Sequence, residues 1–269
     1  MVESMQKVAV ITGSTRGIGF GTAQAFLERG CAVVVCGRTA ASTAGAVGAL
    51  AQRFDPALIL GRPCDVAVTR EVEALWTSAV ERFGHVDIWI NNAGISHDSL
   101  PCWELDESQV EAVVGTNLLG TLNGVRVALR GMRDQGAGSV YLMEGLGSDG
   151  RTVPGVSVYG ATKAAVRYLA GALEKEARDT CVRVIALSPG MVVTDLLVSA
   201  EDRESAGWER AKRVYNILAD RVETAAPWLV DQILKDSPHG ARIAWLTRWK
   251  IVGRFLTAPF RHRDLFGPG

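Results

Sequence analysis

The chain has no excess of charge of either sign. Its 269 residues include 29 Lys and Arg and 29 Asp and Glu, so the formal net charge at pH 7 is zero. Broad binding of nucleic acid or of an acidic lipid surface normally needs a strongly basic field. The balance therefore predicts no nucleic-acid partner, and it confines any charge-driven contact to a local patch.

Cysteines are few and scattered. There are five, an odd number, and none of them forms a pair with metal-ligand spacing: Cys31, Cys36, Cys64, Cys102 and Cys181. Several lie in apolar runs, where cysteine behaves as a small hydrophobic residue. We therefore expect no disulfide framework, no metal site and a reducing, cytoplasmic location.

Long apolar runs, linkers and repeats are also lacking. No stretch reaches eighteen uninterrupted apolar residues, so no transmembrane span is expected. The first apolar run, Val8–Ile11, is too short for the core of a secretory signal. No Pro/Ser/Gly-rich linker, low-complexity tract or repeat divides the chain. We therefore expect one domain over residues 1–269.

Hydrophobic residues are abundant, at 48% of the chain, and they recur in a regular order. Short β-branched runs alternate with longer amphipathic segments, a pattern typical of βαβ units and a parallel sheet. The strands are expected at 7–12, 32–36, 58–64, 86–91, 139–143, 182–187 and 242–247. The helices are expected at 17–29, 40–53, 67–83, 104–133, 156–179 and 222–236. The fold class predicted is α/β, a Rossmann-type doubly wound parallel sheet in three layers.

Two regions interrupt this alternation. Residues 195–221 follow a strand and mix apolar with charged side chains, which favours a lid over a ligand crevice, with an ordinary pair of surface helices as the alternative. Residues 241–269 form a basic aromatic tail, and residues 241–263 carry six Lys or Arg and no acid. This tail could contact a membrane interface or an amphiphilic ligand. The alternative is a final strand and helix with a solvated basic face.

A glycine-rich loop follows the first expected strand. It reads Thr12-Gly-Ser-Thr-Arg-Gly-Ile-Gly19 and leads into a helix. Gly13 allows a tight turn, Gly17 lets the backbone approach a pyrophosphate, and Gly19 allows close helix–strand packing. The placement predicts a dinucleotide site, against the alternative that the glycines serve only a turn.

The end of the second strand indicates which dinucleotide binds. Enzymes that prefer NAD place an acid there to hold the ribose hydroxyls, but this sequence has Gly37 followed by Arg38. A guanidinium can pair with a 2′-phosphate, and Arg16 in the glycine loop can reach the same group. We therefore expect NADP(H).

A tyrosine and a lysine stand one helical turn apart at Tyr159 and Lys163. This spacing puts the ammonium beside the phenol. A free phenol has a pKa near 10, and lowering it by about three units requires roughly 4 kcal/mol of preferential stabilisation of the phenolate. We expect the lysine to act in that direction and the pair to perform acid–base chemistry.

Taken together, the motifs resemble those of the classical short-chain dehydrogenase/reductases. They occur in order: the glycine loop, Asp65, Asn91-Asn-Ala-Gly94, Asn117, Tyr159-x-x-x-Lys163 and Pro189-Gly-Met-Val-Val-Thr194. The resemblance covers residues 5 to about 195 and implies that Asn117 positions a water in a proton relay through Lys163. An asparagine that caps a helix kink is the alternative. The cofactor-binding residues expected are Gly13, Ser14, Thr15, Arg16, Gly17, Ile18, Gly19, Arg38, Thr39, Asp65, Val66, Asn92, Ala93, Gly94, Tyr159, Lys163, Pro189, Gly190, Val192 and Thr194.

The carbonyl-binding serine of that family is missing from its usual place. It normally lies thirteen residues before the tyrosine, where this chain has Leu146. The nearest hydroxyl is Ser148, in a glycine-rich setting that permits a rearranged loop. We expect Ser148 to polarise the carbonyl. Alternatively it is a turn serine, and Ser157 or a backbone N–H supplies the donor, or there is no such donor.

The loop Met143-Glu-Gly-Leu-Gly-Ser-Asp-Gly150 further resembles that of the plant chlorophyll b reductases, with the same displaced serine. The resemblance implies an NADPH-dependent reductase of a bulky, hydrophobic aldehyde or ketone, with catalytic residues Asn117, Ser148, Tyr159 and Lys163. It also implies a homodimer or homotetramer, paired through the helices at 104–133 and 156–179. Two alternatives are a steroid, retinoid or other lipid alcohol dehydrogenase, and a non-catalytic NADP-binding regulator.

Overall fold

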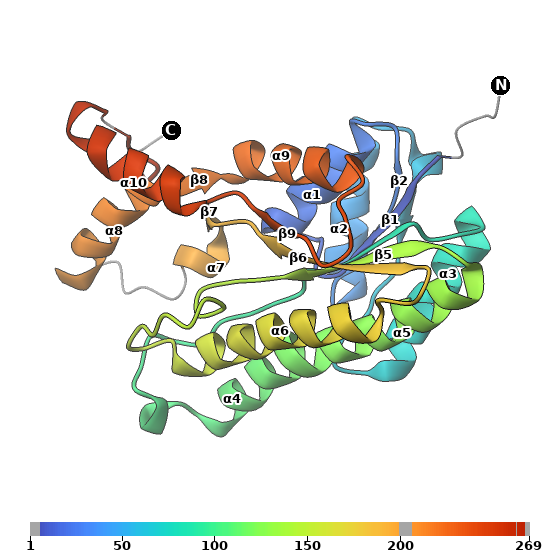
Figure 1. The fold of residues 1–269 in the computed structure, drawn as a ribbon, viewed down its shortest axis with the longest axis horizontal. Coiled ribbons are helices and arrows are strands. Elements are labelled where there is room, and N and C mark those ends of the chain that lie inside the picture. Colours follow the sequence, from blue (N-terminus) through green and yellow to red (C-terminus); the bar gives the residue numbers. More distant parts are fainter. Residues whose placement is uncertain (1–5, 199–205, 262, 267–269) are drawn as a thin grey trace.

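A parallel sheet of seven strands forms the centre of the molecule. The computed structural model describes residues 6–198, 206–261 and 263–266. The strand order is β3-β2-β1-β4-β5-β6-β9 (Figure 1). The strands are β1 (Val8–Ile11), β2 (Ala32–Val35), β3 (Ile59–Gly61), β4 (Ile88–Asn91), β5 (Gly138–Met143), β6 (Val182–Ser188) and β9 (Arg242–Ala244). The predicted doubly wound α/β fold is confirmed.

Helices cover both faces of the sheet. One layer contains α1 (Gly17–Leu27), α2 (Ala40–Ala51) and α9 (Val222–Leu234). The other contains α3 (Thr69–Phe83), α4 (Glu107–Val114), α5 (Gly120–Gln135) and α6 (Ser157–Glu176) (Figure 1). Further elements lie beyond the carboxyl ends of the strands: α7 (Asp195–Val198), α8 (Ala206–Leu218), α10 (Arg248–Thr257), and a two-stranded sheet of β7 (Met191–Val193) and β8 (Ala219–Arg221).

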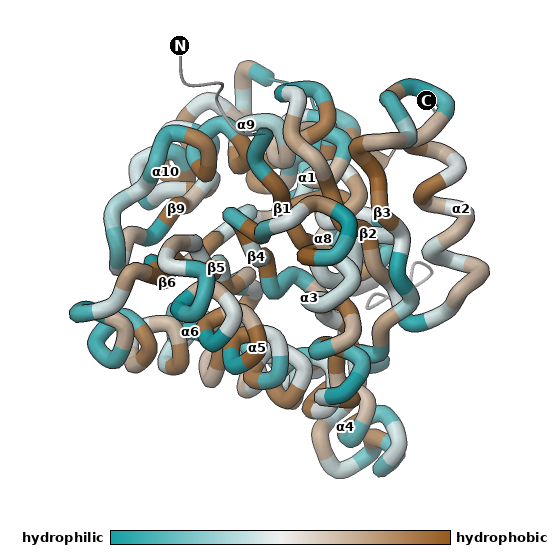
Figure 2. The backbone as a smooth tube through the Cα atoms, turned by 90° about the vertical axis from the view of Figure 1, so that its right-hand side faces the viewer, coloured by the Kyte–Doolittle hydropathy of each residue, from teal (hydrophilic) through white to brown (hydrophobic). Residues whose placement is uncertain are grey.

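Strand residues are apolar on both sides because both faces of the sheet are covered. In β1, Ala9 and Ile11 pack in the core beneath α1 and α9, whereas Val10 packs in the core beneath α3 and α5. Each of these three residues is fully buried. Figure 2 shows the resulting hydrophobic centre between more polar helices. A continuous apolar run is the expected signature of such a strand.

The helix expected at 104–133 is interrupted by a π-helical turn. Gly115–Leu119 separates α4 from α5, and α5 continues to Gln135. The extra residue in this turn changes the direction in which the side chains on either side of it point. Asn117 lies in the π-helical turn and is fully buried.

Some strands are shorter than expected: β3 covers Ile59–Gly61 and β9 covers Arg242–Ala244. The stretch 195–221 contains α7, α8 and β8, and residues 199–205 of this expected lid lie outside the described residues. The tail contains a strand and a helix, as one alternative predicted, but its basic residues do not form one solvated face: Arg248 and Arg261 are exposed, whereas Arg254 and Arg263 point to the buried Asp220. Among the described residues, no helix is both long and apolar enough to cross a membrane.

The order of the strands fixes where a ligand can bind. β1 pairs with β2 on one side and with β4 on the other. The strands β2 and β3 therefore extend the sheet in one direction from β1, and the strands from β4 onward extend it in the opposite direction. Connecting loops diverge at such a switch point and leave a crevice beyond the carboxyl ends of the strands. The glycine loop after β1 and the Asn-Asn-Ala-Gly segment after β4 meet there.

Candidate active site

One large cleft lies beyond the carboxyl ends of the strands. Its volume is about 1760 Å³, larger than the ~300–1,000 Å³ typical of drug-sized ligand sites. The predicted residues that line it are Gly13, Thr15, Arg16, Gly17, Ile18, Gly19, Arg38, Thr39, Asp65, Val66, Asn92, Ala93, Gly94, Ser148, Tyr159, Lys163, Pro189, Gly190, Val192 and Thr194. The cleft has room for a dinucleotide together with a second molecule.

Two predicted residues do not line the cleft but support it. Ser14 is fully buried; its hydroxyl donates to the Ile11 carbonyl at 2.6 Å and accepts from the Cys36 N–H at 3.0 Å. This side chain therefore ties the glycine loop to β2. Asn117 is likewise buried.

The glycine loop has the backbone that a phosphate cradle requires. Gly13 and Gly17 have φ of +62° and +56°, in the left-handed region that favours glycine. A Cβ at Gly13 would lie 2.7 Å from the Cα of Ala93, so the two loops touch. Helix α1 begins at Gly17, and its first N–H groups have no carbonyl within the helix to bond. Those donors and the helix dipole suit a pyrophosphate.

Asn92 contributes an unpaired acceptor to this cradle. Its Nδ2 donates to the carbonyls of Thr12, at 2.8 Å, and Gly13, at 3.1 Å. Its Oδ1 is buried and has no hydrogen-bond partner among the described residues. A buried polar atom without a partner is costly unless a ligand or water satisfies it. The cradle and this acceptor fit the backbone and hydroxyl groups of a dinucleotide.

The far end of the cleft contains the residues expected to select the cofactor. A Cβ at Gly37 would lie 2.5 Å from Thr15 Cγ2, so a larger side chain there, including an acid, does not fit without displacement. Arg38 and Thr39 are exposed on the cleft wall. Arg16 forms only a solvent-exposed ion pair with Asp195 at 3.6 Å. Both guanidinium groups are thus accessible to an anion.

Tyr159 and Lys163 meet at the inner end of the cleft. Both lie on α6, and Lys163 Nζ is 5.8 Å from the centre of the tyrosine ring. The phenol hydroxyl lies next to Gly145, at a place where an added Cβ would collide with it. Gly145 therefore sets the position of the hydroxyl by leaving room for it.

Burial governs the protonation of both groups. It raises the pKa of Tyr159 to about 12, whereas the sequence analysis expected the lysine to lower it. It also lowers the pKa of Lys163 to about 8, and the ammonium donates to the Met143 carbonyl at 3.3 Å. Desolvation disfavours the charged form of each side chain and outweighs their mutual attraction. At neutral pH the phenol consequently keeps its proton.

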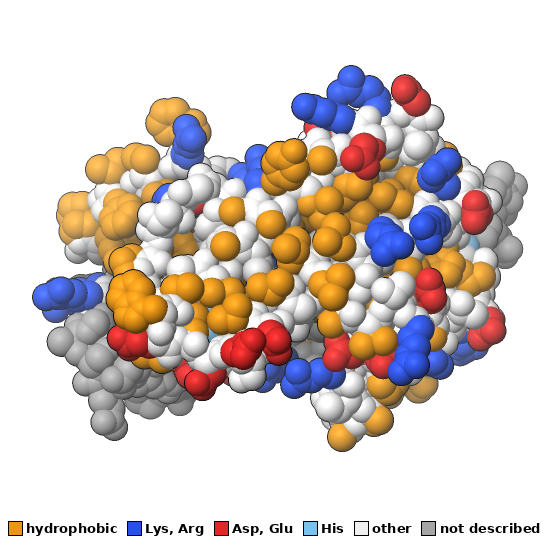
Figure 3. Space-filling view, turned by 90° about the horizontal axis from the view of Figure 1, so that it is seen from below, with side chains coloured by type: hydrophobic (Ala, Val, Ile, Leu, Met, Phe, Trp, Pro, Cys, Tyr) orange, Lys and Arg blue, Asp and Glu red, His pale blue; other side chains and the backbone are white. Residues whose placement is uncertain are grey.

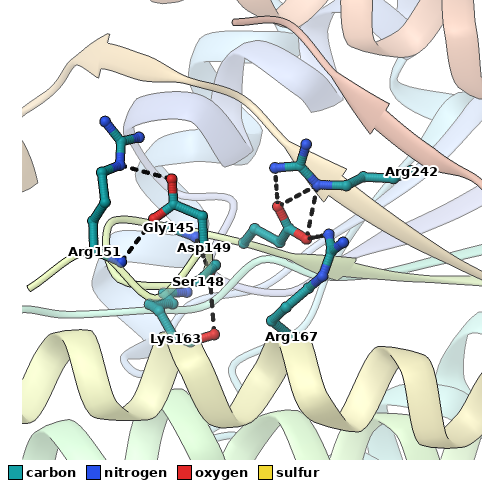
Figure 4. A network of polar contacts seen from close by, with 8 residues as sticks. Gly145, Ser148, Asp149, Arg151, Lys163, Arg167 and Arg242 are labelled. Carbon is teal, nitrogen blue, oxygen red and sulfur yellow. Dashed lines mark hydrogen bonds and ion pairs between the residues drawn. The ribbon is translucent and has the colours of Figure 1, made fainter. Parts of the chain in front are cut away.

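Ser148 is buried in the cleft wall, but its hydroxyl has partners other than Tyr159. It accepts from the Gly145 N–H at 3.0 Å and donates to the Lys163 carbonyl at 3.1 Å. Figure 4 shows these bonds joining the loop after β5 to α6. The serine thereby holds Gly145 beneath the tyrosine hydroxyl.

Asn117 joins three parts of the site. Its Oδ1 accepts from the Ile95 N–H at 2.8 Å, and its Nδ2 donates to the Ile95 carbonyl at 2.9 Å and to Thr162 Oγ1 at 3.1 Å. Thr162 is the residue before Lys163. The π-helical turn thus holds the segment after β4 against α6.

Glu144 is a site residue that the sequence analysis missed. Its carboxylate is buried and is contacted by Arg167 of α6 and by Arg242 of β9, with Arg242 Nη2 at 2.7 Å (Figure 4). All three residues line the cleft. This ion cluster fixes the residue next to Gly145 to two other elements. No local sequence signal pairs Glu144 with a residue 98 positions away.

His97 was also missed. It is buried, its Nε2 accepts from the Tyr159 N–H at 3.3 Å, and its Nδ1 lies 2.7 Å from the Asp98 carbonyl. The imidazole satisfies an N–H in the first turn of α6, where such donors have no partner within the helix. It therefore helps to fix where α6, the helix of Tyr159 and Lys163, begins. Among the described residues, no group of three or more His, Cys, Asp or Glu side chains could hold a metal ion.

Several known proteins with similar sequences are named as reductases. The chain is 34% identical over 273 residues to the probable chlorophyll(ide) b reductase NYC1 of Arabidopsis thaliana, covering 96% of this chain and 54% of that protein. It is 39% identical to the chlorophyll(ide) b reductase NOL of Oryza sativa subsp. japonica, covering 92% and 74%. The chain spans about half the length of the NYC1 proteins it matches.

These relatives correct one expectation. Four of them, two from Arabidopsis thaliana and two from Oryza sativa subsp. japonica, are named as chloroplastic proteins. The cytoplasmic location expected from the sequence is therefore wrong. The scattered cysteines indicate a reducing compartment, but they do not indicate which reducing compartment of the cell it is.

Solved structures and a family match complete the comparison. A 3-ketoacyl-(acyl-carrier-protein) reductase from Brucella melitensis, complexed with NADH, has a TM-score of 0.77 at 25% identity, covering 90% of this chain and 98% of that one. Residues 7–205 match the short chain dehydrogenase family. The chain therefore belongs to the short-chain dehydrogenase family of oxidoreductases.

Proposed function

We propose that the protein is an NADPH-dependent reductase that transfers hydride to the carbonyl of a hydrophobic aldehyde or ketone. The observation that carries this proposal is the phenol of Tyr159, which lies in the cleft, keeps its proton at neutral pH and has the buried Lys163 beside it. A proton donor of this kind is needed to neutralise the alkoxide formed when a carbonyl is reduced.

The residues of the chain divide the work of the reaction. A nicotinamide cofactor, when bound, supplies the hydride. Tyr159 donates its proton to the carbonyl oxygen as negative charge develops there, and Lys163 stabilises the resulting phenolate. Asn117 positions the helix that carries both residues. Relay of a proton from solvent to Lys163 through a water near Asn117 is part of the proposal.

Ser148 is proposed to bind the substrate carbonyl. Its proton points to the Lys163 carbonyl in the structure, so a substrate oxygen has to replace that acceptor while the bond from Gly145 stays. This exchange needs only a rotation about the C–O bond of serine, because a hydroxyl turns to suit its acceptor. The present pairing of Ser148 is also what favours the second candidate, a non-catalytic NADP-binding regulator.

The choice of NADPH rests on the groups around Gly37. An acid at Gly37 would have to displace the Thr15 side chain, and Arg38 and Arg16 offer two guanidinium groups on the cleft wall. These arginines would bind the 2′-phosphate of NADPH, whereas an acid at this position would bind the ribose hydroxyls of NAD. The neighbouring hydroxyl of Thr39 caps α2 by accepting from the Ser42 N–H at 3.2 Å, which fixes the loop.

The substrate class follows from the walls of the remaining cleft. Apolar side chains from the loop after β5, from α7 and from α10 line it: Leu146, Val153, Leu196, Leu197 and Ile251. Such walls select size and shape more than individual polar groups. The named relatives suggest a bulky pigment-like carbonyl compound. A lipid alcohol dehydrogenase is the alternative within enzymes, and a panel of aldehydes, ketones and alcohols would separate the two.

Self-association is proposed through the layer formed by α4, α5 and α6. Figure 3 shows that hydrophobic side chains are spread over this face of the molecule among charged ones. Exposed apolar residues there include Val114 and Leu119. Pairing of two copies through these long helices would produce a homodimer or, with a second interface, a homotetramer.

Replacing Tyr159 with Phe should abolish most of the turnover. Loss of a general acid typically costs about 10²–10⁴-fold, so a fall of roughly a thousandfold in kcat is expected, with the NADPH Kd nearly unchanged. NADPH oxidation and cofactor fluorescence measure the two quantities. Tyr168→Phe is the matched control, because Tyr168 lies on the same helix and is 81% exposed. Unchanged turnover in Tyr159→Phe would support the regulator.

Replacing Ser148 with Ala should lower kcat by about 10²-fold, as removal of a carbonyl-binding donor does in other enzymes. The Ser157→Ala variant tests the alternative donor and is expected to keep its activity, since Ser157 is exposed and outside the cleft lining. Thermal unfolding should be followed in parallel, because Ser148 also links Gly145 to α6. A normal kcat for Ser148→Ala would remove its proposed role.

Replacing Lys163 with Met should raise stability while removing activity. At pH 7 the lysine is charged in both states, and burial of that charge opposes folding by roughly 3 kcal/mol, given a pKa lowered from 10.5 to about 8. As pH rises through 8, the folded state loses its proton first, so wild-type stability increases towards pH 10. Urea unfolding should show a gain for Lys163→Met at pH 7 that shrinks near pH 10.

The control for this prediction is Lys175→Met on the exposed side of the same helix. It should show no such pH-dependent gain. A Lys163→Met variant that is destabilised at pH 7, or whose gain does not change with pH, would contradict the predicted cost of the buried charge.

Replacing Arg38 with Ala should weaken NADPH selectively. Hydrogen bonds to charged groups contribute about 1.5–3 kcal/mol, so KM for NADPH should rise about 10–100-fold while KM for NADH changes little. Steady-state kinetics with both cofactors measures this shift. Arg62→Ala, an exposed arginine outside the cleft lining, is the control. Equal losses for both cofactors would argue against 2′-phosphate recognition.

A further inference from the structure

Helix α10 has its apolar residues on the outside. Trp249, Val252 and Leu256 fall on one face of the helix, and their exposed fractions are 85%, 49% and 71%. Phe260, in the turn that follows, is 87% exposed. A surface helix of a soluble protein normally turns its apolar stripe towards the core. The orientation of α10 is the reverse.

Charged side chains of the tail occupy the side of α10 that faces the protein. Arg254 Nη2 donates to Asp220 Oδ2 at 2.7 Å, and Arg263 Nη2 donates to Asp220 Oδ1 at 3.0 Å. Trp245 Nε1 donates to the same carboxylate at 2.6 Å, and Arg254 also donates to the Leu218 carbonyl at 2.8 Å. Asp220 is buried in β8. These bonds hold the helix with its apolar face outward.

This apolar face therefore lacks a covering element in the described part of the chain. A patch of several large, exposed apolar side chains normally marks a contact surface. The face lies on a helix that projects from one end of the molecule, beside α8 (Figure 1), and hydrophobic side chains gather at that end next to Lys and Arg (Figure 3). A projecting, convex face suits a flat, deformable surface.

The charge around the face indicates what kind of surface. Residues 241–266 contain six Lys or Arg and one acid, Asp264. Arg242, Arg254 and Arg263 are ion-paired with the buried carboxylates of Glu144 and Asp220, so the positive charge near the face comes from Arg248, Lys250 and Arg261. The one buried acid that faces the helix, Asp220, is already paired with two arginines. Arg248 and Arg261 are exposed at the two ends of the apolar face. Aromatic and aliphatic residues bordered by cations bind at the headgroup level of anionic bilayers.

The same helix forms part of the cleft. Thr247, Arg248 and Ile251 line the cleft, whereas Trp249 and Leu256 on the other side do not. A bilayer that covers the outer face of α10 would therefore lie at the mouth of the cleft. A hydrophobic substrate could then enter without crossing water, a consequence that rests on the proposed function.

We propose that the outer face of α10 and the following turn, formed by Trp249, Val252, Leu256 and Phe260, docks on the surface of an anionic lipid bilayer. The apolar side chains enter the headgroup region, and the exposed arginines contact lipid phosphates and carboxylates. Binding is weak without anionic lipid and falls as salt is raised, because the cationic contribution is screened.

Vesicle sedimentation of the full chain tests this proposal. Vesicles of phosphatidylcholine with phosphatidylserine should bind the protein at least about tenfold more tightly than phosphatidylcholine alone. The triple variant Trp249→Ser, Leu256→Ser, Phe260→Ser should lose about tenfold or more of this binding. Arg261→Glu should reduce binding only to the anionic vesicles. Absence of wild-type binding to the vesicles that contain phosphatidylserine, or equal binding to both kinds of vesicle, would overturn the proposal.

Trp103→Ser is the matched control, because Trp103 is also 85% exposed but lies on a separate turn, Cys102–Glu104. It should bind vesicles like the wild type; an equal loss would show that α10 is not the docking face. Light scattering without lipid should give the same mass for the wild type and the triple variant. A lower mass for the variant would identify a second copy as the occupant and overturn the membrane assignment. Reduction of a small water-soluble carbonyl reports the proposed reaction separately.

Discussion

The contact between the loops after β1 and β4 is the constraint on which the rest of the site depends. Thr12 Oγ1 donates to the Ile90 carbonyl and accepts from the N–H groups of Asn92, at 2.9 Å, and Ala93, at 3.0 Å. One hydroxyl thus joins the ends of β1 and β4 at the switch point and holds the two loops that border the crevice together. Close approach of these loops leaves no space for a side chain at Gly13. The phosphate cradle is a consequence of that fit.

A second set of contacts transmits this frame to the reacting groups. The segment after β4 reaches α6 through Asn117 and His97, while the loop after β5 reaches the same helix through Ser148 and Glu144. These contacts fix the position of α6, and none of them places a charged group beside the phenol of Tyr159. The protonated state of Tyr159 accordingly comes from burial, which suits donation of a proton during reduction. Oxidation of an alcohol would first require a lower pKa.

Features encoded locally could be predicted from the sequence, and features encoded by distant contacts could not. The glycine loop, the Tyr-x-x-x-Lys spacing and the alternation of strands and helices along the chain follow from short-range patterns. The pairing of Glu144 with Arg242 joins two elements that are far apart in the sequence, so no pattern indicated it. Asn117 was found through family resemblance, but the π-helical turn around it looked like ordinary helix. The tail's composition left both a membrane-contacting surface and a solvated basic face open, because composition does not reveal which side of a helix is buried.

Two arrangements in this structure oppose folding or solubility and so need a reason to persist. Lys163 is buried without a carboxylate partner among its described contacts, and α10 presents tryptophan, leucine and phenylalanine to water. Natural proteins break local rules mainly where function requires it. The buried lysine lies at the inner end of the cleft and the apolar helix at its mouth. A reductase that takes a water-insoluble substrate from a lipid surface would need a costly feature at each of these ends, one for the chemistry and one for delivery.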